Sequence, residues 1–505
     1  MAVKTFAAID VGSYELGMKI FEISPKNGMK EIEHIRHRIA LGADTFATGK
    51  VSYEKIEELC RVLTEFKGIM KTYKVEEYKT YATSAIRETD NKRILLDQIR
   101  VKTGMKIEIL SNSEQRFLDY KSIAFRGEEF KHLLEKGTAI VDIGGGSIQI
   151  SLFMKDTLVA TQNLKLGVLR LLEHMNHLNA KPTQYDGLVE EFVSAQLEVF
   201  KKLYLKDREI QNIIVVDDYL SRLLRRGQLE GTKEGYVEAE TYRRFTNAVQ
   251  KKTALDISRT YDIPEEILPM LHITVVLIKQ ILSMMDAKLI WAPGVTLCDG
   301  IAYEYAEKNK LAVIDHDFEQ DIIACAQNIS KRYMGSKKRS ETLEKIALTI
   351  FDSTKKVHGL GKRERLLLRI ATILHDCGKF ISMMNLGECS YHIVMSTEII
   401  GLSHTEREVV ANVVKYNHAE FDYPETVDYL TIAKLTAILR VANALDRSHK
   451  QKFKDIKTVL KENRLVMTVA SDADITLERG LFKERADFFE EVFSVKPVIK
   501  QRKSL

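Results

Sequence analysis

Two short segments of this sequence place an aspartate, glycines and a serine at matching positions. The residues are Asp10, Gly12 and Ser13 in AAIDVGS, and Asp142, Gly144, Gly145, Gly146 and Ser147 in AIVDIGGGS. Glycine has no Cβ, so another group can come close to its backbone. Peptide N–H groups that line a turn form a concavity for anions, and phosphate is the ligand that this pattern predicts. A plain hairpin turn between strands is the alternative interpretation.

The repeated spacing indicates a duplicated unit. A strand-like alternation follows both segments, ELGMKIFEI after the first and IQISLF after the second. If the two strand-turn-strand units are copies of one another, we expect their turns to face a single cleft.

A different chemistry is suggested by ATILHDCGKF. His375 and Asp376 are adjacent late in an apolar helical segment, and Asp446 lies in another predicted helix, AILRVANALDRSH. A His-Asp pair with a distant Asp is the ligand set of HD-type metal phosphohydrolases, in which imidazole and carboxylate bind a divalent cation that activates water. A structural polar cluster between helices is the alternative. The earlier helix KKRSETLEKIAL has no histidine to complete the set.

The elements that must position the two glycine segments are predicted to be α/β. Residues 1–124 and 125–308 each alternate strand and helix patterns, which is typical of sheets flanked by helices. In the first of them, helical spacing predicts an apolar stripe made of Ile56, Leu59, Leu63, Phe66 and Met70.

The remaining residues form two further predicted domains. Residues 316–450 show helical periodicity, and Thr405 with Glu408 has the spacing of a capping box at one helix start. Residues 451–505 return to strand-like alternation and are predicted to form a small α+β domain.

Composition excludes several classes of protein. A chain of 505 residues exceeds one core, and 45% hydrophobic with 29% charged residues is typical of a soluble protein. There is no secretory signal and no uncharged stretch of about 18 residues, so we expect a cytoplasmic protein with no membrane partner. Five scattered cysteines argue against a disulfide framework, and a net charge of +5 is too small to indicate nucleic-acid binding.

Seven segments in order resemble the exopolyphosphatase and guanosine pentaphosphate phosphohydrolase (Ppx/GppA) family of the actin-like ATPase superfamily. They are AAIDVGS, YATSAIRE, the helix after ILSNSEQR, VDIGGGS, LKLGVLRL, HDCGKFIS and LRVANALDRS. The resemblance implies two actin-like, ribonuclease-H-like domains, an HD-like helical domain and a small α+β domain. It also implies a cytoplasmic homodimer that takes part in the stringent response and hydrolyses a terminal phosphoanhydride between its first two domains. Magnesium, with an accompanying monovalent cation, is the implied cofactor.

The resemblance also assigns roles to particular residues. The two glycine segments match the family's phosphate turns, and Arg87 matches the arginine of its ATSAxR segment. An in-line attack on phosphorus needs backbone donors, a cation and an arginine fork more than covalent chemistry. Asp142 and Asp10 are then the expected magnesium ligands, and Glu114 is the expected base.

The sequence departs from the family pattern at several of these positions. The family's S-G-x-E-E-A-R is SNSEQRF here, so Gln115 replaces one of two adjacent acids, and GGGSTE is GGGSIQ, so Gln149 replaces another. GSN becomes GSY at Tyr14, and a Gly-Gly pair becomes Asp217-Asp218. An amide can hold a water but cannot take its proton, and loss of a general base typically costs about 10²- to 10⁴-fold in rate.

Three functions remain open at this point. The first is release of orthophosphate from inorganic polyphosphate, with basic residues such as Lys337, Lys338, Arg339, Lys362 and Arg363 extending a track for the chain or simply forming a solvated face. The second is hydrolysis of guanosine pentaphosphate at the same cleft. The third is a non-catalytic binder of polyphosphate or an alarmone, which the two amide replacements favour.

Overall fold

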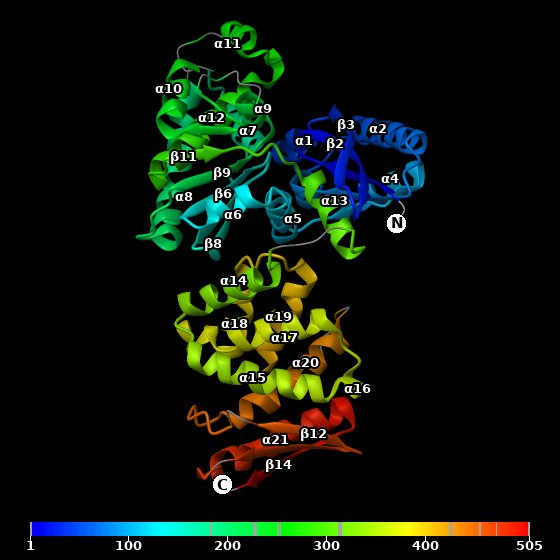
Figure 1. The fold of residues 1–505 in the computed structure, drawn as a ribbon, viewed down its shortest axis with the longest axis vertical. Helices are drawn as coiled ribbons and strands as arrows, with labels where there is room; N and C mark the ends of the chain where they lie inside the picture. Colours follow the sequence, from blue (N-terminus) through cyan, green and yellow to red (C-terminus); the bar gives the residue numbers. More distant parts are fainter. Residues whose placement is uncertain are drawn as a thin grey trace. The chain divides into compact units, whose positions relative to one another are not determined.

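The computed structural model of the chain contains two compact units, Met1–Phe318 and Glu319–Leu505 (Figure 1). The structure describes residues 3–181, 184–225, 229, 231–249, 252, 254–311, 316–423, 426, 428–453, 456–470 and 472–502. Each unit is described by itself.

The first unit begins with a five-stranded sheet of order β3-β2-β1-β4-β5. Its elements are β1 (Lys4–Val11), β2 (Glu15–Ser24), β3 (Gly28–Arg38), α1 (Leu41–Thr48), α2 (Tyr53–Thr72), β4 (Glu77–Ala82), α3 (Ser84–Glu88), α4 (Lys92–Thr103) and β5 (Glu108–Ile109). Strands β1, β2 and β3 are antiparallel neighbours, whereas β4 runs parallel to β1. The predicted apolar stripe is confirmed, because all five of its side chains are buried where α2 packs on this sheet.

The second sheet repeats this arrangement and adds one edge strand. Its order is β10-β11-β9-β6-β7-β8, so β8-β7-β6-β9-β11 corresponds to β3-β2-β1-β4-β5. The elements are α5 (Asn112–Ala124), α6 (Glu128–Leu134), β6 (Thr138–Ile143), β7 (Ile148–Met154), β8 (Thr157–Leu164), α7 (Val168–His177), α8 (Tyr185–Phe200), a π-helical turn (Lys201–Leu205), β9 (Asn212–Val216), α9 (Asp218–Arg225), β10 (Tyr236–Glu238), α10 (Ala239–Val249), α11 (Ala254–Tyr261), a 3-10 turn (Glu265–Ile267), α12 (Leu268–Met285) and β11 (Leu289–Trp291). The shared strand order supports the predicted duplication.

The segment Glu265–Met285 is long and apolar enough to cross a membrane by length and composition alone. In this fold, however, α12 packs in the core against the second sheet, and 67% of its most apolar window is buried. Burial of this kind is what a core helix of an α/β protein shows.

The helix α13 (Leu297–Lys308) belongs to the first sheet rather than the second. It follows β11 in sequence but packs on α5 and β1, and the buried Lys19 of β2 forms an ion pair with the part-buried Asp299 at 2.8 Å. The sequence places this helix inside a domain of residues 125–308; the structure shows that the chain returns to its first half there, because α13 supplies the apolar residues that cover Phe6 and Ala8.

The second unit is helical and ends in a small sheet. Its elements are α14 (Phe318–Arg332), α15 (Lys337–Ser353), α16 (Lys355–His358), α17 (Lys362–Leu374), a 3-10 turn (Cys377–Phe380), α18 (Leu386–Ser396), α19 (His404–Tyr416), α20 (Tyr429–Leu445), β12 (Lys457–Lys461), β13 (Arg464–Ala470), α21 (Thr476–Phe493) and β14 (Lys496–Arg502). The sheet has the order β12-β13-β14, and α21 packs on α20, so the predicted regions 316–450 and 451–505 join in one compact unit.

The capping-box prediction is wrong by two residues. The N-cap of α19 is Ser403, whose side chain accepts a hydrogen bond from the backbone of Glu406 while the Glu406 side chain accepts one from Ser403. Both pairs have the same spacing, and Glu406 of the observed pair also accepts a hydrogen bond from Arg363.

Candidate active site

The two glycine segments form turns of the same construction. In the first, the N–H of Gly12 donates to the carbonyl of Glu15 at 3.1 Å; in the second, the N–H of Gly144 donates to the carbonyl of Ser147 at 3.0 Å. The aspartates also match, since Asp10 and Asp142 are each the second-last paired residue before the turn of their hairpin. The duplication therefore extends to individual hydrogen bonds.

These two turns approach each other closely. A Cβ added to Gly145 would lie 2.9 Å from the Cβ of Ser13, and one added to Gly146 would lie 2.7 Å from the hydroxyl of Ser84. Ser13 and Ser84 in turn share a hydrogen bond of 2.7 Å. The bare backbone of the triple glycine is thus required by the first half of the unit, which contacts it where a side chain would otherwise be.

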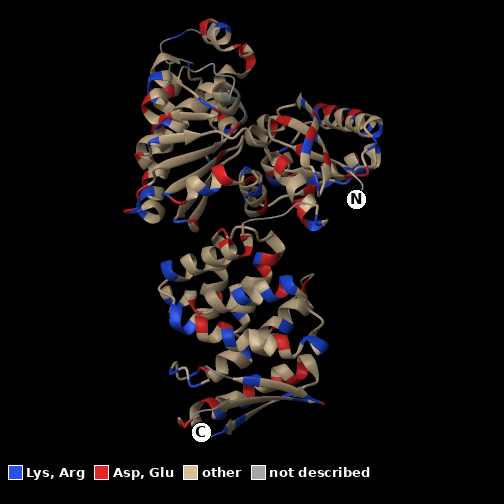
Figure 2. Cartoon of the chain, in the orientation of Figure 1, with Lys and Arg blue, Asp and Glu red and all other residues tan. Residues whose placement is uncertain are grey.

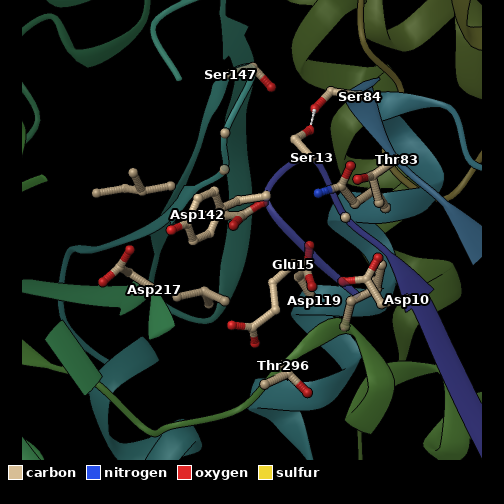
Figure 3. Close-up of a pocket in the computed structure, with 18 of the residues that line it drawn as sticks. Asp10, Ser13, Glu15, Thr83, Ser84, Asp119, Asp142, Ser147, Asp217 and Thr296 are labelled. Atoms are coloured by element: carbon tan, nitrogen blue, oxygen red, sulfur yellow. Dashed lines mark hydrogen bonds between the residues drawn. The ribbon is translucent and has the colours of Figure 1, made fainter. Parts of the chain in front are cut away.

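Both turns line one cavity of about 180 Å³ (Figure 3). The predicted residues around it are Asp10, Gly12, Ser13, Asp142, Gly144, Gly145 and Ser147. The expectation that the paired turns share a cleft is confirmed. Gly146, Arg87 and Glu114 are not among the lining residues.

The lining is strongly acidic. It contains five carboxylates, those of Asp10, Glu15, Asp119, Asp142 and Asp217, and one basic side chain, that of Arg36. Arg36 forms an ion pair with Glu15 at 3.2 Å. A phosphate group is itself an anion, so it would need a cation to enter this cavity.

Asp119 is the functional candidate that the sequence analysis missed. It lies on α5, is 4% exposed, and shares a hydrogen bond with Asp142. Burial, together with the carboxylates of Asp142 and Asp10, raises the pKa of Asp119 well above its usual range, although Arg116 opposes the shift. Its Oδ2 atom is buried and accepts no hydrogen bond from the residues that the structure describes. The signal that could have found it is its position four residues after Gln115, which puts both side chains on the face of α5 that lines the cavity.

Glu114 has a structural role in this fold. Its carboxylate accepts a hydrogen bond of 2.9 Å from the backbone N–H of Ser111, and the Ser111 hydroxyl accepts one from the Glu114 backbone. This capping box starts α5 and so positions Gln115 and Asp119.

The two glutamines occupy different surroundings. Gln115 lines the cavity, whereas Gln149 is buried beside it and accepts a hydrogen bond of 2.9 Å from Arg116, which also donates to Thr161. The amide of Gln149 thus holds the side chain of Arg116, a residue of α5, against strands of the second sheet.

Arg87, the arginine that matches the family pattern, and Arg170 each donate a hydrogen bond to a backbone carbonyl. Arg87 donates to the carbonyl of Leu110 at 2.7 Å. Arg170 donates to the carbonyl of Gly146 at 2.9 Å and to Glu88 at 2.6 Å, which ties the second turn to the end of α3. Of the acidic pair at positions 217 and 218, Asp217 lines the cavity and caps α9 by accepting from the N–H of Leu220 at 2.7 Å; the side chain of Asp218 is outside the described residues.

The predicted HD-like centre is an ion-pair network in which His375 Nε2, Asp376 Oδ1 and Asp446 Oδ2 are buried and have no hydrogen-bond partner among the described residues. Arg339 lies between the two aspartates, 3.2 Å from Asp376 and 3.8 Å from Asp446, and donates to Asn443 at 2.9 Å. His375 is fully buried with Nδ1 bonded to the carbonyl of Thr372, and burial lowers its pKa to about 3.

The structure does not confirm a metal site at this centre. Arg339 comes from KKRSETLEKIAL, the helix that has no histidine to complete an HD-type ligand set, and its guanidinium supplies the positive charge that a metal would provide. Within the described ranges, no group of three or more His, Cys, Asp or Glu side chains is arranged to hold a metal ion.

Comparison with known proteins finds matches over most of the chain. The Ppx/GppA phosphatase family matches residues 19–309, and domain III of the Ppx/GppA phosphatases matches residues 323–485. A guanosine-5'-triphosphate,3'-diphosphate pyrophosphatase of Photobacterium profundum is 20% identical over 482 residues, which are 92% of this chain and 91% of the relative.

Other relatives match the chain over shorter lengths. Exopolyphosphatase 2 of Mycobacterium tuberculosis is 25% identical over 211 residues, 39% of this chain and 63% of the relative. A bifunctional 3-dehydroquinate synthase/phosphatase of Fusobacterium nucleatum is 26% identical over 215 residues, and the match spans 31% of that protein's length.

Two solved structures share the fold. The Aquifex aeolicus member of the Ppx/GppA family has a TM-score of 0.50 at 19% identity, covering 63% of this chain and all of that chain. An exopolyphosphatase-like protein has a TM-score of 0.52 at 20% identity, covering 61% of this chain and all of that chain. With the paired turns, the acidic cavity and the two family matches taken together, the chain belongs to the Ppx/GppA phosphatase family.

Proposed function

We propose that this protein hydrolyses the terminal phosphoanhydride of inorganic polyphosphate and releases orthophosphate. The observation that carries the proposal is the cavity in which two duplicated glycine turns and buried carboxylates face one another. Water would attack the terminal phosphorus, the bridging oxygen would leave on the shortened chain, and the water's proton would pass to a carboxylate. The exopolyphosphatase relative supports this substrate class.

A divalent cation, most simply Mg²⁺, fits the acidic lining. Asp10 and Asp142 would hold it, since Mg²⁺ is usually bound by one or two carboxylates plus substrate phosphate oxygens and waters. When bound, the cation would neutralise charge on the terminal phosphate and make its entry into the acidic cavity favourable. An accompanying monovalent cation is part of the same proposal.

Asp119 is proposed as the group that takes the proton from water, in place of Glu114. Glu114 is engaged in the capping box, whereas the carboxyl of Asp119 faces the cavity and lies one helical turn beyond Gln115. Gln115 could hold the water by its amide while Asp119, in its ionised form, accepts the proton. The acid that the family pattern has at position 115 would thus be replaced by one at position 119. Backbone N–H groups of the paired turns, with Ser13 and Ser147, are proposed to bind the phosphate.

The test is phosphate release from long-chain polyphosphate with magnesium. The wild-type protein should turn over, Asp119→Asn should lose most of the rate, and Glu114→Gln should keep most of it. If turnover survives Asp119→Asn but is lost in Glu114→Gln, then Glu114 and not Asp119 is the general base. No release by the wild-type protein would overturn the proposed function.

Guanosine pentaphosphate is the second candidate substrate. The favouring observation is that the Photobacterium pyrophosphatase aligns with 92% of this chain. Competition between polyphosphate and guanosine pentaphosphate in a single turnover assay separates the two, because the preferred substrate suppresses hydrolysis of the other.

A non-catalytic binder of polyphosphate or an alarmone is the third candidate. It predicts tight binding without turnover. Because Gln149 is engaged with Arg116 outside the cavity, the informative restoration is Gln115→Glu. A rate created by that single substitution would support the binder hypothesis for the present sequence.

Location and assembly are proposed from the family alone. A cytoplasmic homodimer, without a nucleic-acid or membrane partner, is the proposed state. The five cysteines are free thiols, as suits a reducing compartment. Sedimentation of the purified protein would test the dimer.

A further inference from the structure

The helical unit contains a second, larger cavity of about 630 Å³. It lies where the ends of α19 and α20 meet α21, the 3-10 turn Cys377–Phe380 and the start of α18. Its lining is basic, with Arg339, Lys379, Arg447, Arg485, His418 and His449. Elsewhere basic and acidic residues are interspersed along both units (Figure 2).

We propose that this cavity is a binding site for a small organic anion that carries at least two phosphate groups. The site is separate from the proposed catalytic cleft, and the inference does not depend on hydrolysis there.

The floor of the cavity is preorganised. The Arg339 side chain is 7% exposed and is fixed by Asp376, Asn443 and Asp446. Lys379 is held beside it by an ion pair with Asp376 at 3.2 Å. Asp376 and Asp446 therefore balance the charge of Arg339 and Lys379, and the floor needs little rearrangement to receive a ligand.

The charges of the two other arginines that line the cavity, Arg447 and Arg485, are not balanced in this way. Within the described part of the chain, neither Arg447 nor Arg485 has a hydrogen bond or an ion pair. Arg485 is half-buried, and burial together with the neighbouring Arg447 lowers its pKa, while Glu484 opposes this. Two arginines that line one cavity and repel one another are stabilised when an anion binds to both, and guanidinium groups match phosphate oxygens well.

The acid that lines the cavity does not balance these two arginines. Glu388 lines the rim but pairs with Lys415 at 3.0 Å. His418 also lines the cavity and donates a hydrogen bond to the carbonyl of His375 at 2.8 Å. It therefore contributes a neutral hydrogen-bonding group and no charge. Burial lowers the pKa of His418 to about 4.

One wall is apolar, which favours an organic ligand over inorganic phosphate. Met383 and Met384 line the cavity and are 75% and 94% exposed. Methionine side chains are flexible and polarizable, so they pack adaptably against flat or irregular groups. The cavity volume is in the range of about 300–1,000 Å³ that small-molecule sites occupy. A nucleoside polyphosphate fits this lining. Its phosphates would contact the arginines, and its base would contact the methionines.

The test is calorimetric titration of the full-length protein with guanosine diphosphate in buffer that contains EDTA. Removal of divalent cations prevents turnover and metal-dependent binding at the acidic cleft. We expect saturable binding at one site per chain, and at least about tenfold weaker binding for the double variant Arg447→Gln with Arg485→Gln. The matched control is Arg464→Gln with Arg502→Gln, which removes two exposed arginines of the small sheet and should leave binding unchanged.

Inorganic triphosphate as a second probe tests the organic part of the ligand. If the methionine wall takes part, guanosine diphosphate binds more tightly than triphosphate, and Met383→Ala with Met384→Ala weakens only the nucleotide. Binding of triphosphate alone would overturn the organic assignment. Absence of saturable binding by both probes, or equal binding by the Arg447/Arg485 variant and its control, would overturn the site; unchanged circular dichroism establishes that the variants are folded.

Discussion

Buried aspartates gather at two places in this molecule, and their counter-charges differ. In the cleft of the first unit, Asp119 lies beside Asp10 and Asp142, and its pKa is raised. In the helical unit, burial also favours the protonated form of Asp376, but His375, Lys379 and Arg339 lower its pKa. The first, open cluster lines an acidic cavity that suits a metal ion, whereas the aspartates of the second, closed cluster are already paired with an arginine.

The largest expected effect tests the open cluster. Asp119→Asn should lower the rate of phosphate release by about 10²- to 10⁴-fold, because the amide cannot take a proton from water. The control is Asp321→Asn, a buried aspartate of the other unit. Equal rates for Asp119→Asn and the wild-type protein would remove the basis for treating this cluster as catalytic.

A substitution in the closed cluster of the helical unit should change the free energy of unfolding and not the rate of phosphate release. Arg339→Ala leaves Asp376 and Asp446 buried without their cation, so we expect a loss of about 3–5 kcal/mol in the free energy of unfolding. Trp291, the single tryptophan, lies in the first unit, so thermal unfolding that changes circular dichroism without changing its fluorescence reports the helical unit. A variant as stable as the wild-type protein would show that the network is not needed to balance these charges.

Magnesium should distinguish the two clusters directly. At a concentration 100 times its dissociation constant it should stabilise the first unit by about 2.7 kcal/mol, seen as a higher transition temperature in Trp291 fluorescence. The transition of the helical unit should not move, and Asp142→Asn should abolish the shift. A magnesium-dependent shift in the helical unit would contradict the closed network.

Acid should weaken the helical unit first. Burial lowers the pKa of His375 to about 3 and that of His418 to about 4. The unfolded chain takes up these protons near pH 6.5 and the folded chain does not, so stability is complete above that pH and falls as pH is lowered. The loss is roughly 1.4 kcal/mol per pH unit for each histidine, down to the folded pKa. Melting at pH 5 and pH 7 measures it, and His418→Asn should reduce the difference.

The smallest effect is expected at the start of α5. Glu114→Gln keeps an acceptor in the capping box but loses its charge near the helix N-terminus, so we expect a loss of about 0.3–1 kcal/mol, measured by denaturant unfolding. Phosphate release should change little, in contrast with Asp119→Asn.

The paired turns were predictable because the duplication leaves the same residue order twice in the sequence. Asp119 was not, because a single carboxylate in a helix belongs to no motif, and only the fold brings it to Asp10 and Asp142. The sequence alone presents Arg339 as one of several charged residues in a basic segment. Its partners Asp376 and Asp446 are distant in sequence, so its burial could not be read from local spacing.

Helix α13 has a practical consequence for anyone who divides this protein. A fragment that stops at residue 124 would expose Phe6 and Ala8 and would remove Asp299, one of the two carboxylates that pair with Lys19. Such a truncation should be insoluble, whereas grafting Leu297–Lys308 onto its end by a short linker would rebuild the missing layer.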